Sequence, residues 1–452
     1  MIKIIPTIGP ITNEIKNLKV LSKYSNIFRL NASHNDINWH KKTLQNILKL
    51  KKNIKILVDI PGVKPRTKNN KNINIKKNSI IIFYNNEKPK VKFKRSVFIL
   101  LSNPIPQNNI FKKNNILSVE DGKYLFKIKK FTKKYIVTTA ERSLVLKPNK
   151  GVNIPNSIYD NNLQEKKYLQ FLKKLEKFEY HAIGLSFIQD HKLIIKLKKK
   201  YPDKLIISKI ENLEGVRNMF LICFHSDVIM IDRGDLAAEI GNEKLFETIL
   251  KISQICKSLS KPLMIATENL DSMINNQAPT KSEIFTLGYY KEINVDSIML
   301  SDETATSLNW KNTIKWIYKF FNDLKKDQKK KFKNDENFWS LLRNDLKLPL
   351  IIFTKRGESI NNVEKLSYFN EVNVFTENKK IKTLYEFKKN INVFLTRRFD
   401  NKNLLKFIKT NINKFSKSIF KSNDQIIVIY ISYPRKNSRA NTMMLLNKKD
   451  FL

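Results

Sequence analysis

Short apolar runs rich in Ile, Val and Leu recur along the chain, and each is followed by a polar tip and then by a stretch with helical periodicity. In order, these runs are "IKIIPTIGP", "NIFRLNASH", "IKILVDIPG", "HAIGLSFIQD", "LIISKIEN", "DVIMIDRGD", "PLMIATEN" and "SIMLSDET". Nearly continuous apolar strands that alternate with amphipathic helices are typical of a parallel sheet covered on both faces. Eight such units predict an α/β fold, a (β/α)8 TIM barrel.

Two regions depart from a plain barrel. After the third predicted strand, "IIIFYN", "SVFILL" and "KYIVTTA" alternate with a period of two residues between Asn and Gly turns, which predicts a small all-β insertion. Towards the end of the chain, "LPLIIFTKRG", "NEVNVFTEN" and "NINVFLT" begin a new strand and helix alternation. We predict a barrel from residues 1–67 and 151–335, an inserted β-barrel-like lid domain at 68–150 and a C-terminal α/β domain at 336–452.

The predicted strand ends carry a concentration of charged and hydroxyl side chains. They are Arg29, Asn31, Ser33, Asp59, Ser186, Lys209, Glu211, Asp235, Thr267, Ser301 and Glu303. The carboxyl ends of the strands form the active-site face of a (β/α)8 barrel. The sequence therefore predicts a site at that face.

The formal net charge of +44 would by itself suggest a nucleic-acid partner. However, the lysines are spread along the whole chain beside many Asn and Ile residues, as in a composition set by an adenine- and thymine-rich genome. A nucleic-acid-binding surface would be a localised basic stripe with interleaved aromatic side chains. We expect no specific nucleic-acid partner, and the alternative left open is binding driven by charge alone.

The chain contains no apolar run of about 18 residues, and it begins with strand-like residues instead of a signal peptide. We expect a cytoplasmic protein without a membrane partner. Cys223 and Cys256 lie in apolar, helix-like contexts without metal-ligand spacing. Two buried free thiols are favoured over a disulfide.

Eleven segments, in this order along the chain, resemble the pyruvate kinase family. They are "TIGP", "FRLNASH", "VDIPGVKPRT", "VEDGK", "LKPNKGVNIP", "LSFIQD", "ISKIENLEGV", "DRGDLAAEIG", "IATENLDSM", "APTKSE" and "MLSDETA". The resemblance is expected to cover nearly the whole chain. It implies transfer of the phosphoryl group of phosphoenolpyruvate to ADP in the last step of glycolysis, in a homotetramer that uses Mg²⁺ or Mn²⁺. The alternatives are an inert or weakly active relative and a sister enzyme for another phosphorylated acid.

The pair Glu211 and Asp235 follows two neighbouring strands, and carboxylates are suitable oxygen ligands for Mg²⁺. Lys209 lies two residues before Glu211, on the same face of a strand, so its ammonium can stabilise a phosphoryl group in transit beside the metal. Alternatives are a pair of surface carboxylates and a simple salt bridge between Lys209 and Glu211.

The turn at Gly234 and Asp235 opens a helix, where backbone N–H groups favour an anion. The resemblance implies that this turn and Thr267 bind the carboxylate of phosphoenolpyruvate, and that Thr267 and Lys209 are the catalytic residues. Arg29 can clamp the transferring phosphoryl group through its guanidinium, although a structural salt bridge is the alternative.

The resemblance also assigns the nucleotide site. It implies that Arg66 and Lys150 bind the nucleotide phosphates, with the turn that contains Asn31, Ser33 and His34 nearby. For Arg66, as for Arg29, a structural salt bridge is the alternative. Lys150 lies where the predicted β insertion rejoins the barrel, so we expect the insertion to close over the site as a lid.

In many members of the family a K⁺ ion is bound by residues that match Asn31, Ser33, Asp59 and the backbone of Ile60. Lys64 stands here where many members carry glutamate. Its ammonium could replace the cation, so we expect activity without K⁺.

Three further positions depart from the family pattern: Gln189 replaces arginine, Glu268 replaces glutamine, and Asp232 in "DRGD" replaces alanine. Each adds negative charge or removes positive charge near an anionic substrate. The C-terminal domain lacks a convincing effector loop, so weak or absent activation by sugar phosphates is expected.

Overall fold

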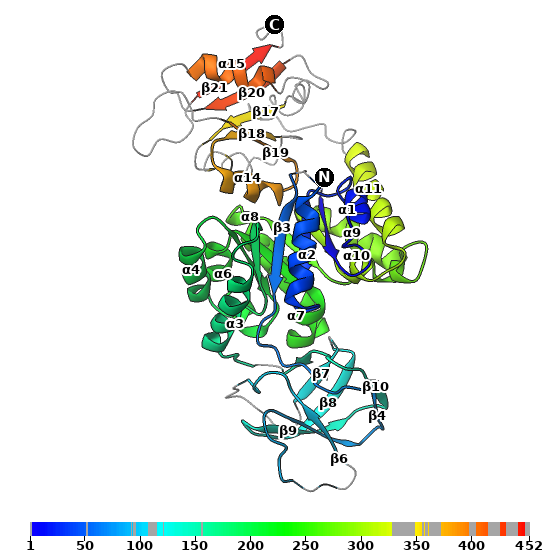
Figure 1. Cartoon of the computed structure of the whole chain (residues 1–452). Helices are drawn as coiled ribbons and strands as arrows, with labels where there is room; N and C mark the ends of the chain where they lie inside the picture. Colours follow the sequence, from blue (N-terminus) through cyan, green and yellow to red (C-terminus); the bar gives the residue numbers. More distant parts are fainter. Residues whose placement is uncertain are drawn as a thin grey trace. The chain divides into compact units, whose positions relative to one another are not determined.

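The computed structural model describes residues 2–327 apart from 51–52, 92, 94–95, 107–114, 121 and 155–156. In the C-terminal part it describes residues 349–354, 357, 360, 372–396, 404–414, 425–430 and 442–447. The chain divides into two compact units, Ile5–Thr313 and a second unit of Met1–Ile4 with Ile314–Leu452, and each is described by itself (Figure 1).

Eight parallel strands close into a barrel, in the order β1-β16-β15-β14-β13-β12-β3-β2. They are β1 (Lys3–Ile8), β2 (Ile27–Asn31), β3 (Lys55–Ile60), β12 (Ala182–Leu185), β13 (Leu205–Ile210), β14 (Val228–Asp232), β15 (Leu263–Ala266) and β16 (Ser297–Leu300). All residues of β3 and of β12 to β16 are buried, as expected for strands covered on both sides. The predicted barrel is confirmed.

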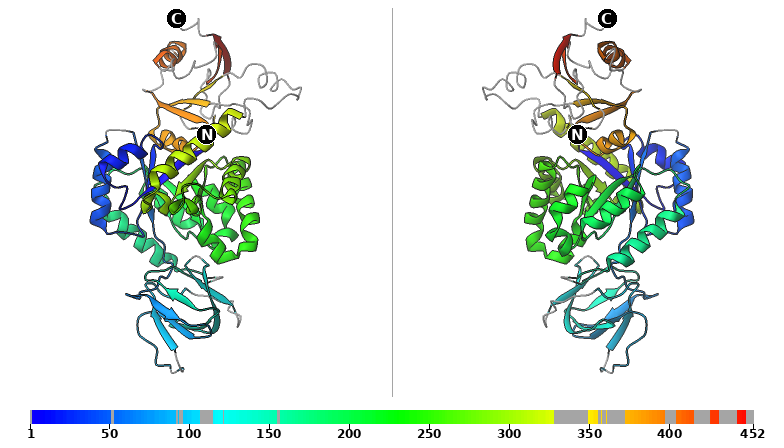
Figure 2. Two further views of the ribbon diagram at one scale, coloured as in Figure 1. Left: turned by 90° about the vertical axis from the view of Figure 1, so that its right-hand side faces the viewer. Right: turned by 90° about the vertical axis from the view of Figure 1, so that its left-hand side faces the viewer.

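Helices surround the barrel strands (Figure 2). They are α1 (Ile15–Leu21), α2 (Ile37–Leu48), α3 (Asn161–Lys174), α4 (His191–Lys200), α5 (Leu213–Arg217), α6 (Met219–His225), α7 (Arg233–Ile240), α8 (Asn242–Ser258), the 3₁₀ turn η1 (Asp271–Ile274), α9 (Lys281–Glu292) and α10 (Asp302–Ala305). The next helix along the chain, α11 (Trp310–Asp327), belongs for most of its length to the second unit. Asp36, Asp160 and Asp190 cap α2, α3 and α4 by accepting hydrogen bonds from free backbone N–H groups. These caps fix where the helices begin.

Between β3 and α3, the described residues contain strands and no helix, as predicted for an all-β insertion. A six-stranded sheet has the order β11-β7-β8-β9-β5-β6, and β10 pairs with β4. The strands are β4 (Ile73–Ile75), β5 (Ile80–Tyr84), β6 (Ser96–Leu100), β7 (Ile116–Val119), β8 (Tyr124–Phe131), β9 (Tyr135–Ala140), β10 (Leu144–Leu146) and β11 (Val152–Asn153). Its own core includes Phe83 packed edge-on against Phe126, with ring centroids 5.5 Å apart. The strand pattern thus builds a separate apolar core.

The C-terminal unit contains a five-stranded sheet in the order β19-β18-β17-β20-β21. Its elements are β17 (Leu350–Phe353), β18 (Val372–Thr376), α14 (Lys379–Glu386), β19 (Ile391–Leu395), α15 (Leu404–Lys414), β20 (Gln425–Tyr430) and β21 (Thr442–Asn447). Four strands are parallel and β21 is antiparallel. Alternate residues of β17 enter separate cores on the two faces, Ile352 on one and Ile351 on the other. This is the predicted α/β domain.

Three other predictions from the sequence concern the two cysteines, an effector loop and the domain boundaries. Cys223 and Cys256 are buried free thiols as predicted, with their sulfur atoms 4.0 Å apart. Most of residues 355–371 and all of residues 431–441 in the C-terminal domain lie outside the described residues, so the predicted lack of an effector loop stays a prediction. The residue boundaries of the domains stay predictions.

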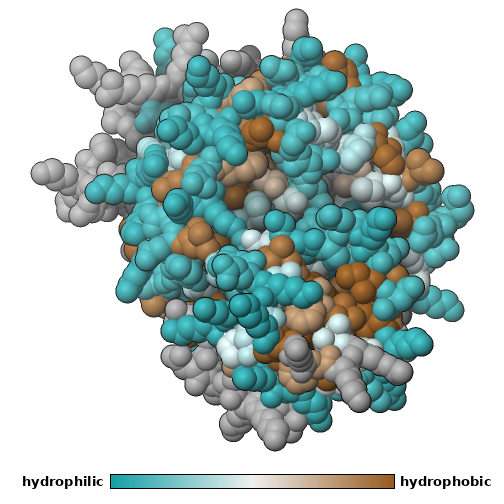
Figure 3. Space-filling model, turned by 60° about the horizontal axis from the view of Figure 1, so that its bottom comes forward, coloured by the Kyte–Doolittle hydropathy of each residue, from teal (hydrophilic) through white to brown (hydrophobic). Residues whose placement is uncertain are grey.

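Among the helices that the structure describes, none combines the length and the apolar character needed to cross a membrane. On the face shown in Figure 3, hydrophilic side chains cover most of the surface and separate several apolar areas.

Candidate active site

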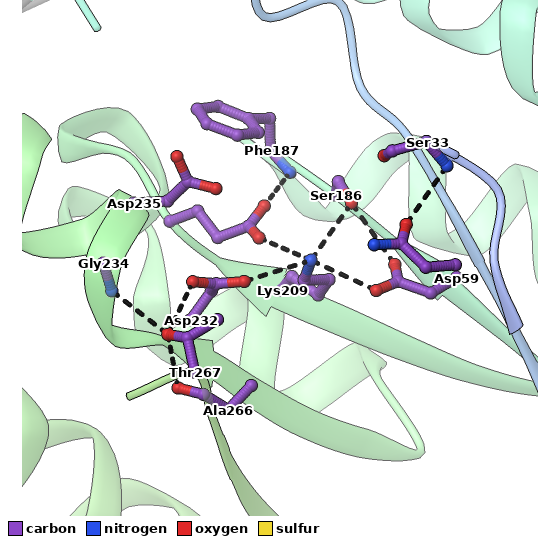
Figure 4. A network of polar contacts seen from close by, with 12 residues as sticks. Ser33, Asp59, Ser186, Phe187, Lys209, Asp232, Gly234, Asp235, Ala266 and Thr267 are labelled. Carbon is purple, nitrogen blue, oxygen red and sulfur yellow. Dashed lines mark hydrogen bonds and ion pairs between the residues drawn. The ribbon is translucent and has the colours of Figure 1, made fainter. Parts of the chain in front are cut away.

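Lys209 lies at the centre of a buried ion network at the carboxyl ends of the barrel strands (Figure 4). Its Nζ is 2.7 Å from Oε1 of Glu211, 3.3 Å from Oδ2 of Asp59 and 3.5 Å from Oδ2 of Asp232. The hydroxyl of Ser186 is 3.3 Å away, and only 4% of Lys209 is exposed. Four strands or strand ends therefore supply the groups around one ammonium.

The charge of Lys209 is maintained by its neighbours. Burial alone lowers the pKa of an ammonium group, but the carboxylates of Asp59, Glu211 and Asp232 outweigh this effect and raise the pKa of Lys209 above its ordinary value. Lys209 is therefore a cation throughout the neutral pH range. The salt bridge to Glu211 considered from the sequence is present, but it is one of three ion pairs.

Asp59 at the end of β3 joins Lys209 to Arg29. The Nε and NH2 groups of Arg29 donate to Oδ2 of Asp59 at 3.0 and 2.6 Å, and its NH1 group donates to Thr7 at 2.9 Å. Burial opposes ionisation of Asp59, but Lys209 and Arg29 outweigh it, so the pKa of Asp59 is lowered. The structural salt bridge considered for Arg29 is thus present at the predicted site.

A glycine on the neighbouring strand makes room for this network. Gly184 on β12 pairs with Asp59 on β3. A Cβ atom at Gly184 would lie 3.0 Å from Oδ1 of Asp59, which is closer than ordinary packing allows. The absence of a side chain at Gly184 therefore lets the Asp59 carboxylate fit against β12.

Three carboxylates gather beside Lys209. One oxygen atom from each of Glu211, Asp232 and Asp235 lies within 4.8 Å of the others. Burial raises the pKa of Glu211, although Lys209 opposes this rise, and Oε2 of Glu211 accepts a hydrogen bond from the Phe187 N–H at 2.6 Å. Carboxylate oxygens are the donors that Mg²⁺ prefers, so Glu211 and Asp235 of this set fit the predicted magnesium site.

Asp235 also pairs with Lys64. The Lys64 ammonium donates a hydrogen bond to Oδ1 of Asp235. Burial disfavours the charged carboxylate, but Lys64 more than compensates, so the pKa of Asp235 is lowered. A Cβ atom at Gly151 would lie 2.8 Å from the Lys64 ammonium, so a larger residue there would require the end of the Lys64 side chain to shift. Lys64 thus forms an ion pair with Asp235, which is one of the two predicted magnesium ligands.

Three of the residues expected to bind K⁺ have oxygen atoms with internal hydrogen-bond partners. The side-chain oxygen of Asn31 accepts from Ser33 N–H at 3.1 Å, the Asp59 carbonyl accepts from Ala32 N–H at 2.9 Å, and the Ile60 carbonyl accepts from Ser186 N–H at 3.3 Å. These bonds shape the turn after β2. Binding of K⁺ by these atoms stays a prediction.

The loop after β15 is held against the start of α7. Thr267 has a φ of 63°, its hydroxyl accepts a hydrogen bond from Gly234 N–H at 3.2 Å, and it can donate to Oδ1 of Asp232 at 3.0 Å. Arg233 donates to the carbonyls of Thr267 and Glu268. The structure therefore brings the predicted residues Gly234 and Thr267 into direct contact.

The predicted nucleotide residues are less buried. The pKa of His34 is lowered mainly by burial and next by the positive charge of Arg66, and the charges of Arg29 and Lys150 act in the same direction. NH1 of Arg66 donates to the carbonyl of Asn149 at 3.2 Å, and the Lys150 ammonium is 3.0 Å from Oε1 of Glu120. Both cations lie where the β insertion joins the barrel, and their role stays a prediction.

Gln189 has a structural explanation. Its Oε1 accepts from the Tyr159 N–H at 2.8 Å, and its Nε2 donates to the Tyr159 carbonyl at 2.9 Å and to Asn161 at 2.7 Å. This neutral side chain therefore holds the segment before α3 in place. The effect of the lost positive charge on an anionic substrate stays a prediction.

Two other carboxylates have raised pKa values. Burial raises the pKa of Glu303 to about 7, and the Glu303 side chain accepts from the N–H groups of Ser301 and Leu270. Burial also raises the pKa of Glu239 to about 7, and its Oε1 accepts from Asn153 and from the Tyr159 hydroxyl. Sequence reasoning missed Glu239, because nothing in the helix pattern marks it as buried.

Asp232 is the other group that sequence reasoning did not assign to the site. The sequence does show that Asp232 in "DRGD" adds a negative charge where the family has alanine, but it does not show which groups this charge contacts. Its contacts with Lys209 and Thr267 depend on how β13, β14 and β15 lie side by side.

A closed parallel barrel with a charged network at its strand ends defines a TIM-barrel protein whose candidate site occupies the usual active-site face. The family described as "Pyruvate kinase, barrel domain" matches residues 1–313, so the chain belongs to the pyruvate kinase family. The predicted resemblance is confirmed for this part. For the C-terminal domain it stays a prediction.

Several curated relatives are similar to the chain. A pyruvate kinase of Buchnera aphidicola is 32% identical over 330 residues, covering 67% of this chain and 66% of the relative. One of Candida albicans is 31% identical over 318 residues, covering 67% and 62%, and one of Thermotoga maritima is 28% identical over 333 residues, covering 72% and 71%. For the first two, the matched part is less than two thirds of the relative's length.

Proposed function

We propose that the protein transfers the phosphoryl group of phosphoenolpyruvate to ADP and so produces pyruvate and ATP. The observation that carries the proposal is the buried Lys209 ammonium beside Glu211, in a barrel of this family. When bound by Glu211 and Asp235, Mg²⁺ or Mn²⁺ would neutralise negative charge on the phosphoryl oxygens.

In this proposal, Lys209 stabilises the phosphoryl group during transfer. Its neighbours already hold the ammonium in place, so little reorganisation is needed when charge moves in the reaction. Arg29 shares Asp59 with Lys209 and clamps the same phosphoryl group. Arg66 and Lys150 bind the phosphates of ADP, next to the turn formed by residues 31–34.

The organic acid binds on the other side of Lys209. The first turn of α7, at Gly234 and Asp235, holds its carboxylate, since a helix N-terminus favours an anion. After transfer, water protonates the enolate, and Thr267 organises this step. The β insertion closes over the site as a lid and excludes water from the phosphoryl group.

We also propose that the protein acts without K⁺, in the cytoplasm and as a homotetramer. The support for the first point is Lys64, whose ammonium supplies a fixed positive charge next to Asp235. The other two points rest on the family alone. Binding of nucleic acids would be driven by charge and would weaken as salt is added.

The test is a coupled assay of pyruvate formation from phosphoenolpyruvate and ADP with Mg²⁺, on wild type and Lys209→Ala. Loss of one preorganised charge typically costs about 3 kcal/mol in the barrier, so turnover should fall about 100-fold. Lys204→Ala is the matched control, because Lys204 precedes the same strand at its other end and donates to the Tyr180 carbonyl. Equal rates for wild type and Lys209→Ala would remove Lys209 from the mechanism, and an inactive wild type would refute the proposed reaction.

A further inference from the structure

Asp232, the last residue of β14, connects the two residues proposed to carry the chemistry. Its Oδ1 lies 3.0 Å from the Thr267 hydroxyl and its Oδ2 lies 3.5 Å from the Lys209 ammonium, and only 6% of Asp232 is exposed. Figure 4 shows the Asp232 carboxylate between these two side chains. We propose that Asp232 is a positioning residue that sets the orientation of the Thr267 hydroxyl for enolate protonation; this inference rests on the proposed function.

The hydroxyl of Thr267 has one proton and two lone pairs. The Gly234 N–H donates to this oxygen at 3.2 Å, which occupies one lone pair. Two acceptors are within reach of the proton, Oδ1 of Asp232 at 3.0 Å and the carbonyl of Ala266 at 2.7 Å. An ionised carboxylate is the stronger acceptor, so Asp232 directs the Thr267 proton toward itself.

The direction of the hydroxyl proton determines which hydrogen bonds Thr267 can make to a water molecule. With its proton on the Asp232 side and Gly234 on one lone pair, Thr267 presents its remaining lone pair to a water molecule. The oxygen can then accept a hydrogen bond from this water and orient it. Asp232 transfers no proton in this arrangement.

Lys209 fixes the other end of the Asp232 carboxylate. The ion pair at 3.5 Å holds Oδ2 toward the phosphoryl side, which leaves Oδ1 directed at Thr267. The backbone also restrains Thr267, because its φ of 63° is uncommon for a β-branched residue. One carboxylate therefore couples the phosphoryl side of the site to the protonation side.

The decisive variant is Asp232→Asn, which keeps the size of the side chain but loses its charge. Enolate protonation is the reverse of proton removal from pyruvate, so it can be followed as deuterium exchange at the pyruvate methyl group by NMR, with Mg²⁺ and inorganic phosphate present. We expect exchange to fall about 10- to 100-fold, as on loss of other orienting partners, while the KM for phosphoenolpyruvate changes less than about twofold. A purely structural role would lower exchange and phosphoryl transfer together and would change KM.

A double-mutant cycle tests whether Asp232 acts through Thr267. Exchange by Asp232→Asn/Thr267→Val should be no slower than by Thr267→Val alone. Asp296→Asn is the control, because Asp296 is also a buried acid but accepts from the Leu263 N–H at the opposite end of the barrel. If Asp232→Asn does not fold, Asp232→Ser serves the same cycle, as it keeps an acceptor without charge.

The outcomes separate the two proposals. The role of Asp232 alone is overturned if wild type forms pyruvate but Asp232→Asn exchanges deuterium at the wild-type rate. The same holds if the losses of exchange rate in the two single variants add up in the double variant. If the wild-type protein neither forms pyruvate nor exchanges the methyl protons of pyruvate, the proposed function is overturned, and this inference with it.

Discussion

Replacing Asp59 with asparagine removes the negative charge that two buried cations share. Asp59 accepts two hydrogen bonds from Arg29, one from Lys209 and one from Ser186, and only 1% of it is exposed. After Asp59→Asn, Lys209 still has Glu211 and Asp232 as partners. Arg29 keeps its hydrogen bond to Thr7 but loses its ion pair.

The expected magnitude follows from Arg29. Breaking a buried ion pair by removing one partner typically costs about 3 to 5 kcal/mol, because a charge is left uncompensated. Asparagine keeps one acceptor oxygen, so we expect the lower end, about 3 kcal/mol of unfolding free energy. Turnover should also fall, since Arg29 and Lys209 lose their common partner.

The assay is urea unfolding of wild type, Asp59→Asn and the control Asp203→Asn, followed by circular dichroism at several pH values. Asp203 is an exposed acid, so its variant should unfold like wild type. The pKa of Asp59 is lowered, so its stabilisation is present above the ordinary value of 3.8 and is lost as pH falls through the folded-state pKa. An Asp59→Asn protein within about 1 kcal/mol of wild type at pH 7 would refute the reasoning.

Two further predictions concern Glu239 and Lys64. The pKa of Glu239 is raised from 4.5 to about 7, so the folded state holds this proton more tightly, and its contribution to the unfolding free energy should fall by about 3 kcal/mol as pH rises through that window. Urea unfolding at pH 5 and pH 8 should therefore show a smaller fall for Glu239→Gln than for wild type, and an equal fall in both proteins would contradict the assignment. Wild type should form pyruvate in buffer free of K⁺ and Na⁺, because Lys64 supplies a fixed cation, and Lys64→Glu should need added K⁺. The idea fails if wild type is inactive until K⁺ is supplied.

The pattern of apolar and polar residues along the chain was enough to predict the barrel and the inserted β sheet. The barrel strands are buried on both sides, so their apolar runs are nearly continuous. In the inserted sheet, β10 alternates buried and exposed residues, which is the period of two residues that a one-sided core requires. The same strand geometry predicted that Lys209 and Glu211 share a face. The helix N-terminus at Gly234 also follows from neighbours in sequence.

The pairings within the site could not be predicted in this way. Arg29 and Asp59 are 30 residues apart, Thr267 and Asp232 are 35 apart, and Lys64 and Asp235 are 171 apart. Likewise, nothing in the sequence around Gln189 indicated its hydrogen bonds to the backbone of Tyr159, 30 residues away.

By itself, the sequence determined the elements, the chemical groups at the strand ends and the family, because these depend on residue type and on spacing along the chain. Only the tertiary structure decided which carboxylate neutralises which cation. Barrel closure and strand register bring distant strand ends within hydrogen-bond distance, and in a buried site the nearest opposite charge controls each pKa. Asp232 illustrates the difference: the sequence showed an added charge, and the fold placed it between Lys209 and Thr267.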